Sequence, residues 1–260
     1  MESVDSDRER INSLSVSSIY VCPVRGLASL EAPDPGRLGQ AAKVAAHLGL
    51  SRLLLPVMEE ALLRPTGAKV GYLDGIIRAL DQMGDAGMNG RLIAPAQHIL
   101  GLDWVAPYLA GGFRDPRADR VFVDGKLRRL RPYDWWVDPS VIRRRVSLFR
   151  ELVGAVHGHP ALTGWLVMDR ALEWPRPGMG AAGLLLQSLL GEIRERDEDI
   201  DVVLGMGWGE LLEPELVLSL VGEVSGLRLS WVPSPGGCST LPLKWKWAGA
   251  DLRNREMSMR

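Results

Sequence analysis

The sequence lacks the features that mark secreted and membrane proteins. Its 260 residues include only two cysteines, Cys22 and Cys238, which are too few for a disulfide framework. No apolar run approaches the roughly 18 residues that a membrane helix needs. The polar, acidic start has neither the basic end nor the apolar core of a secretory signal. These absences predict a soluble cytoplasmic protein with ordinary thiols.

The sequence also lacks an excess of charge of either sign. Its 31 Lys and Arg residues nearly balance 32 Asp and Glu residues, so no field attracts nucleic acid or an anionic membrane. The basic run from Lys126 to Arg131 is interpreted as a solvated loop. The sequence contains no P-loop, no nucleophile elbow and no zinc-ligand spacing. We therefore predict no cofactor, no metal, no nucleic-acid partner and no membrane partner.

What the sequence does contain is a regular alternation of short apolar strands and amphipathic helices. Strands are predicted over residues 19–24, 52–57, 92–96, 161–168, 200–204 and 227–232, and helices over 33–49, 73–87, 138–156, 181–195 and 213–224. Such alternation indicates βαβ crossovers and a parallel sheet. No glycine-rich fingerprint follows the first strand, so a TIM-type (β/α)8 barrel is favoured over an open doubly wound sheet.

The predicted barrel is incomplete, with six to seven recognisable strands. Too few residues follow Val232 for the two missing strand–helix units, which need roughly 50 to 60. The chain divides into a disordered polar tail (1–17), a barrel domain (18–232) and an irregular segment (233–260) that could hold one further strand at 241–247. Either an open sheet edge remains for a protein partner or the tail to cover, or the reading frame has been lost near residues 233–238.

A stretch without a clear period runs from residue 97 to residue 138. It is far longer than the usual connection of about 2 to 6 residues in a β/α unit. It follows the third strand and should therefore lie at the rim of the barrel. A functional loop, a lid and misread secondary structure are the three interpretations.

The apolar run Ala161–Met168 ends abruptly in Asp169 and Arg170, with Glu173 and Trp174 just beyond. In a parallel α/β protein, the carboxyl ends of the strands form the edge where chemistry takes place. These polar residues are therefore the first candidates for a site.

The segment His-Pro-Ala-Leu-Thr-Gly-Trp over residues 159–165, after Asp138-Pro139 and an amphipathic helix, resembles the fourth-strand region of retaining clan A (β/α)8 glycoside hydrolases. That cellulase, mannanase and β-galactosidase-like family has Asn-Glu after the fourth strand, the Glu being the general acid/base. The resemblance places Asp169 at the Asn and Arg170 at the Glu. An arginine cannot supply a proton at neutral pH, because its pKa lies above about 12. The family's second carboxylate, from the seventh strand, has no counterpart that can be located in this sequence, because the region that should hold it is missing or scrambled.

Asp169 and Glu173 are the candidate replacements for the acid/base. A rim rich in tryptophan suits sugar rings, whose apolar faces stack on indole, although the same residues could simply pack beneath the 97–138 segment. The predicted substrate-binding residues are Arg25, Glu59, His98, Trp135, Trp136, Trp174, Trp208, Glu210 and Trp231. An alternative for Arg170 is an ion pair with Asp169, Glu59 or Glu210. His157 and His159 precede the fourth strand and are interpreted as a structural turn.

Three functions remain open. The first is a glycoside-hydrolase-like barrel that is catalytically inactive and acts as a carbohydrate-binding or assembly protein. The second is an active glycosidase that hydrolyses O-glycosidic bonds, with Glu173 or Asp169 as general acid/base. The third is a structural subunit whose open sheet edge is covered by a partner chain.

Overall fold

A computed structural model gives the arrangement of the chain. It describes residues 18–20, 35–63, 65–96, 98–99, 102–114, 120–123, 126–132, 135–168, 179–207, 224 and 226–230. The predicted end segments, 1–17 and 233–260, lie outside the described residues. So does nearly all of the predicted helix 213–224.

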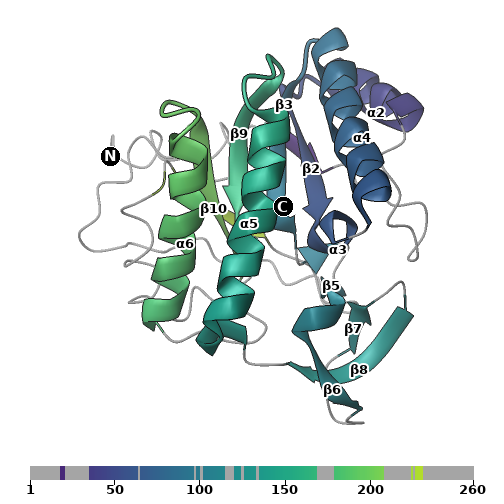
Figure 1. Ribbon diagram of the computed structural model, residues 1–260. Coiled ribbons are helices and arrows are strands. Elements are labelled where there is room, and N and C mark those ends of the chain that lie inside the picture. Colours follow the sequence, from purple (N-terminus) through teal and green to yellow (C-terminus); the bar gives the residue numbers. More distant parts are fainter. Residues whose placement is uncertain are drawn as a thin grey trace, which may run out of the picture.

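The main sheet has six strands, all parallel and in sequential order (Figure 1). The strands are β1 (Ser18–Tyr20), β2 (Arg52–Met58), β3 (Asn89–Ala96), β9 (Leu162–Val167), β10 (Asp201–Gly207) and β11 (Gly226–Ser230). Each overlaps a predicted strand. Parallel strands are covered on both faces, which explains why β2 is an almost continuous apolar run with residues 53–58 all buried.

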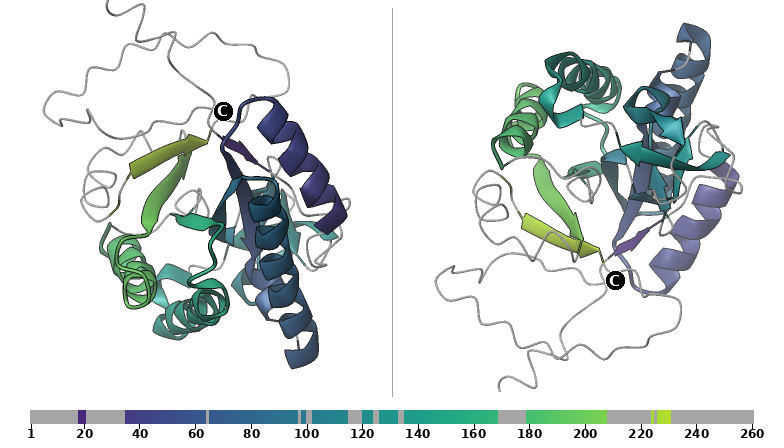
Figure 2. Two further views of the ribbon diagram at one scale, coloured as in Figure 1. Left: turned by 90° about the horizontal axis from the view of Figure 1, so that it is seen from above. Right: turned by 90° about the horizontal axis from the view of Figure 1, so that it is seen from below.

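Four long helices cover one face of this sheet. They are α2 (Pro35–His47), α4 (Thr66–Asp85), α5 (Pro139–Val156) and α6 (Met179–Arg194). Figure 2 shows the strands following an arc with these helices on its outer side. The parallel α/β fold expected from the sequence is confirmed. Within the described residues, no helix combines the length and the apolar character needed to cross a membrane.

Helix α5 begins where the sequence predicts. Asp138 caps it, since its Oδ1 accepts a hydrogen bond from the Ser140 backbone N–H at 2.8 Å, and Pro139 occupies the first turn. The buried stripe of the helix faces the sheet, where Phe149 meets Trp165 of β9 edge to face, with ring centroids 5.3 Å apart. Helix α5 therefore starts near the carboxyl edge of the sheet and packs its apolar side against the outer face of the sheet.

The segment between β3 and α5 is folded, so misread secondary structure is the correct interpretation of its missing period. It forms a second, five-stranded sheet in the order β4-β5-β7-β8-β6. Its strands are β4 (His98–Ile99), β5 (Leu102–Trp104), β6 (Ala110–Arg114), β7 (Arg120–Val123) and β8 (Lys126–Pro132), with 3-10 turns η2 (Pro107–Leu109) and η3 (Trp135–Val137). Figure 1 shows this sheet beyond the carboxyl ends of β2 and β3.

The basic run from Lys126 to Arg131 belongs to strand β8, so its interpretation as a loop is wrong. It pairs antiparallel with β7, with Val121 opposite Arg128 and Val123 opposite Lys126. The apolar partners Val121 and Val123 are buried, while Lys126 is exposed. The adjacent basic residues Arg128 and Arg129 interrupt the apolar and polar alternation that would have predicted a strand.

The inner face of the main sheet carries a charged pair near its amino end. Arg91 of β3 reaches across β9 to form an ion pair with Asp201 of β10. The strand between them has Gly164 at this level, where a Cβ would lie 2.9 Å from Arg91 Nε and 2.8 Å from the Asp201 carbonyl oxygen. The glycine leaves the space through which the arginine passes.

Candidate functional site

The chain makes a sharp turn at the end of β9, the fourth strand of the sheet. Met168 has a φ of 55°, and among the described residues it is the one non-glycine with a positive φ. Its side chain is fully buried, so packing holds it in this uncommon conformation. Asp169 and Arg170 come next in the sequence. They and the nearby candidates Glu173 and Trp174 lie outside the described residues.

Other candidate residues follow the ends of neighbouring strands. β10 ends at Gly207, directly before Trp208, and β11 ends at Ser230, directly before Trp231. Parallel strands bring their carboxyl ends to one edge of the sheet, so these chain positions adjoin the edge that Met168 reaches. Trp208, Glu210, Trp231 and Arg25 lie outside the described residues, and their predicted roles stay predictions.

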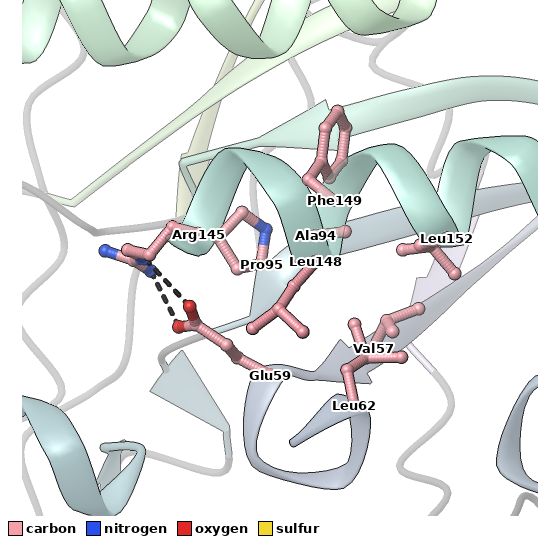
Figure 3. Close-up of a pocket in the computed structure, with 9 residues that line it drawn as sticks. All are labelled: Val57, Glu59, Leu62, Ala94, Pro95, Arg145, Leu148, Phe149 and Leu152. Atoms are coloured by element: carbon pink, nitrogen blue, oxygen red, sulfur yellow. Dashed lines mark hydrogen bonds and ion pairs between the residues drawn. The ribbon is translucent and has the colours of Figure 1, made fainter. Parts of the chain in front are cut away.

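Glu59 is the candidate that the structure describes in most detail. It follows β2 as the first residue of the short helix α3 (Glu59–Leu62), and its side chain is only 5% exposed. Arg145 of α5 donates from Nε to Glu59 Oε1 at 3.1 Å, and its Nη2 lies 3.1 Å from Oε2 (Figure 3). Tyr108 of η2 also donates its hydroxyl to Oε1. Intramolecular donors therefore occupy this carboxylate.

Tyr108 stays a neutral phenol in this setting. Burial raises its pKa well above the usual range, and the negative charge of Glu59 raises it further. Arg144 lies over the Tyr108 ring, with its guanidinium carbon 4.6 Å from the ring centroid. A hydrogen bond to Glu59 requires the protonated hydroxyl, so the raised pKa and the geometry agree.

Trp135 and Trp136 pack inside the protein. They are 0% and 4% exposed and stack on each other with ring centroids 3.9 Å apart. The guanidinium carbon of Arg145 lies 4.3 Å from the Trp135 centroid. Their burial agrees with the interpretation that these tryptophans pack beneath the 97–138 segment. Their role in sugar binding stays a prediction. His98 begins β4 of the second sheet, and its side chain lies outside the description.

A small cavity separates α5 from the sheet near the Glu59–Arg145 pair. It has room for about one water molecule, far less than a sugar ring needs. Figure 3 shows the pair at one end and apolar side chains around the rest. The lining residues are Val57, Glu59, Leu62, Ala94, Pro95, Arg145, Leu148, Phe149 and Leu152.

The two histidines before β9 serve the turn in which they lie. The Ala161 backbone N–H donates to His159 Nδ1 at 3.2 Å, so Nε2 carries the proton and donates to Asp81 at 3.1 Å. His157 Nδ1 lies 2.8 Å from the carbonyl oxygen of Gly154. Within the described ranges, no group of three or more His, Cys, Asp or Glu side chains could hold a metal ion.

Sequence reasoning missed Arg145 as a buried residue. It lies on the apolar stripe of α5, between Val141 and Leu148, where the helical spacing expects an apolar side chain. That break in the stripe was a usable signal. The partner of Arg145 was not predictable, because Glu59 is 86 residues away in the sequence.

Comparison with known proteins supports the fold. No family model and no curated protein matches the chain. GH5_18 from Streptomyces cattleya in complex with GlcNAc is a solved structure that matches with a TM-score of 0.59 and 13% identity, covering 76% of this chain and 46% of that one. The exo-beta-1,4-mannosidase Op5Man5 from Opitutaceae bacterium strain TAV5 matches with a TM-score of 0.61 and 14% identity, covering 82% and 37%.

The beta-galactosidase from Marinomonas ef1 also matches, with a TM-score of 0.56, 10% identity, and coverage of 83% of this chain and 40% of that one. The chain has a glycoside-hydrolase-like fold. It spans less than half the length of these three structures. These matches confirm the predicted TIM-type barrel, which is incomplete in the described residues. At such low sequence identities the comparison supports the fold alone.

Proposed function

We propose that this glycoside-hydrolase-like barrel binds carbohydrate at the carboxyl edge of its sheet without hydrolysing it. The observation that carries the proposal is Arg170, at the position where the resembled family has its proton-donating glutamate. A guanidinium keeps its charge at any physiological pH and cannot act as a general acid. The chain thus keeps the barrel fold but has no proton-donating carboxyl group at position 170 to start glycosidic cleavage.

Two features of the fold support this alignment. β9 is the fourth strand of the sheet, as the resemblance requires. The left-handed backbone at Met168 turns the chain immediately before Asp169 and Arg170. Strain of this kind is often found where a fold presents residues to a ligand.

Glu59 does not offer a replacement acid. It is buried, and its carboxylate already accepts hydrogen bonds from Arg145 and Tyr108. A general acid must carry a proton that points toward the leaving oxygen. This leaves Glu173 and Asp169 as the carboxylates on which an active enzyme would depend.

The solved structures suggest the ligand with which to begin. GH5_18 from Streptomyces cattleya was solved with GlcNAc, and variants of GH5_18 proteins were solved with Manb1-4GlcNAc. For this chain we infer a short oligosaccharide containing mannose or N-acetylglucosamine. The tryptophans that follow strand ends, such as Trp208 and Trp231, are suited to stack on its rings.

The test measures binding and turnover on the same protein. Calorimetry with Manβ1-4GlcNAc and related oligosaccharides should show saturable binding that weakens in Trp208→Ala or Trp231→Ala. A panel of aryl glycosides should show no hydrolysis above background. Hydrolysis that is lost in Glu173→Gln or Asp169→Asn would establish the active glycosidase instead. Failure to bind any sugar would remove the carbohydrate role.

A further inference from the structure

The second sheet has backbone hydrogen bonds of its own. In the described part of the chain its strands pair with one another, and none of them pairs with a strand of the main sheet. The chain leaves the barrel after Ala96, forms β4 to β8 and the turn η2, and continues beyond Pro132 to η3 and α5. Movement of these elements as one body therefore breaks no ladder between strands of the two sheets.

Side-chain contacts at η2 hold this sheet against the barrel. Tyr108 donates its hydroxyl to Glu59, which follows β2, and Arg144 of α5 lies over the Tyr108 ring. Leu109, the next residue of η2, is 0% exposed and belongs to the same apolar core as the barrel. Polar and apolar contacts at one turn thus keep the sheet beyond the carboxyl ends of β2 and β3 (Figure 1).

The barrel side of this contact stays intact without Tyr108. Glu59 and Arg145 both belong to the barrel and pair with each other, with Arg145 Nε 3.1 Å from Glu59 Oε1 (Figure 3). When the Tyr108 hydroxyl moves away, the Glu59 carboxylate keeps its arginine, so no buried charge is left uncompensated. Arg144 is exposed and Tyr108 is only partly buried, so water can replace the contacts that they lose.

We propose that the second sheet and η2 form a lid at the carboxyl edge of the barrel, and that the hydrogen bond from Tyr108 to Glu59 is its latch. The lid opens when this bond breaks, while the barrel and the Glu59–Arg145 pair stay formed. Opening exposes Leu109, so the open form is a minor population. Because β9 pairs with β3, the strand end at Met168 adjoins the edge beside the lid, and opening widens the approach to it. The lid does not depend on which ligand binds there.

Hydrogen exchange of backbone amides, followed by mass spectrometry on the full chain, tests the lid. Amides of β7 and β8 should be less protected than those of β9 and β10, because the lid opens without the barrel. Tyr108→Phe keeps the ring and removes only the hydroxyl. It should lower the protection of β7 and β8 about tenfold, the effect of losing one hydrogen bond to a carboxylate, and leave that of β9 and β10 unchanged.

The matched control is Tyr72→Phe. Tyr72 is a buried tyrosine of α4, and its hydroxyl accepts a hydrogen bond from the Met58 backbone N–H at 2.9 Å, within the barrel. Its replacement should leave the ratio of protection between the two sheets as it is in the unsubstituted protein. Equal protection of the two sheets in the unsubstituted protein would overturn the lid. So would a Tyr108→Phe variant in which both sheets lose protection together or neither does.

Discussion

Gly164 shows how a single residue can determine which side chains meet on the inner face of the sheet. Arg91 and Asp201 lie on strands that flank β9, and their ion pair crosses that strand at Gly164. Any side chain there would meet both the Arg91 guanidinium and the Asp201 backbone. An ion pair that crosses the middle strand is therefore possible only because β9 lacks a side chain at that level.

Gly164→Ala should lower the free energy of unfolding by about 1 to 3 kcal/mol, because the new methyl group overlaps packed atoms. The measurement is urea denaturation followed by circular dichroism. Gly154→Ala is the matched control, since an added Cβ on that exposed residue of α5 meets nothing within 4 Å and should stabilise the helix by roughly 0.5 to 1 kcal/mol. Equal effects of the two changes would show that Gly164 is not tightly enclosed.

Tyr108 gives a prediction for the dependence of stability on pH. Its pKa is raised in the folded protein, so the unfolded chain releases the phenolic proton at a lower pH than the folded chain does. The contribution of Tyr108 is fully present below about pH 10, the unfolded value, and is lost progressively as the pH rises above it. Stability should accordingly fall more steeply above pH 10 in the unsubstituted protein than in Tyr108→Phe. Stability curves of the two proteins that run parallel from pH 9 to pH 11 would contradict a raised pKa for the partly buried Tyr108 phenol.

At the scale of elements, the Glu59–Arg145 pair joins the turn after β2 to helix α5. Both side chains are almost fully buried, so removing one leaves the other charge without compensation. The Tyr108 hydroxyl brings the turn η2 into the same contact. Three segments that are distant in the sequence thus meet at one carboxylate.

Glu59→Gln should cost about 3 to 5 kcal/mol of stability, because the Arg145 charge stays buried without its partner. The double variant Glu59→Gln, Arg145→Met should recover part of this loss, since it removes both charges. A double-mutant cycle from chemical denaturation measures the coupling. Additive losses in the cycle would mean that the two side chains act independently.

The start of α5 depends on the Asp138 cap. Asp138→Ala should destabilise the protein by about 1 kcal/mol, because the Ser140 N–H loses its acceptor at the helix end. The control is Asp85→Ala. Asp85 is an exposed acidic residue at the C-terminal end of α4, and its replacement should change stability by less than about 0.5 kcal/mol. Thermal denaturation compares the two. If Asp138→Ala is as stable as the control, the Asp138 cap does not stabilise this helix.

At the scale of the whole molecule, the described residues form part of a barrel. The described main sheet has six strands and ends at β11. The chain also spans less than half the length of the matched structures. In the family that the fourth strand resembles, the second catalytic carboxylate follows the seventh strand.

Restoring the acid at position 170 alone is not expected to restore hydrolysis. Arg170→Glu places a carboxyl group at the family's acid/base position, but retaining hydrolysis needs a second carboxylate at about 5 to 5.5 Å. Aryl-glycoside turnover by this variant is expected to stay at the level of the unsubstituted protein. Clear turnover would mean that a nucleophile is already in place and that the barrel is closer to a working enzyme.

The sequence by itself determined the alternating strands and helices of the main sheet and the cap of α5. These features depend on local periodicity and on residues within one turn of each other, such as Asp138 and Ser140. The sequence also identified the end of β9 as a candidate site, because an apolar run that stops at charged residues can be recognised from the sequence alone.

Only the tertiary structure decided which charges are buried together. Arg145 was predictable as a residue of the helix, but its contact with Glu59 and Trp135 depends on how α5 packs on the sheet. The second sheet was equally hidden, since its short strands pair with one another within the segment, and adjacent basic residues in β8 break the alternation of a strand. Pairing between distant residues leaves no local period, which is why these features appear only once the chain is folded.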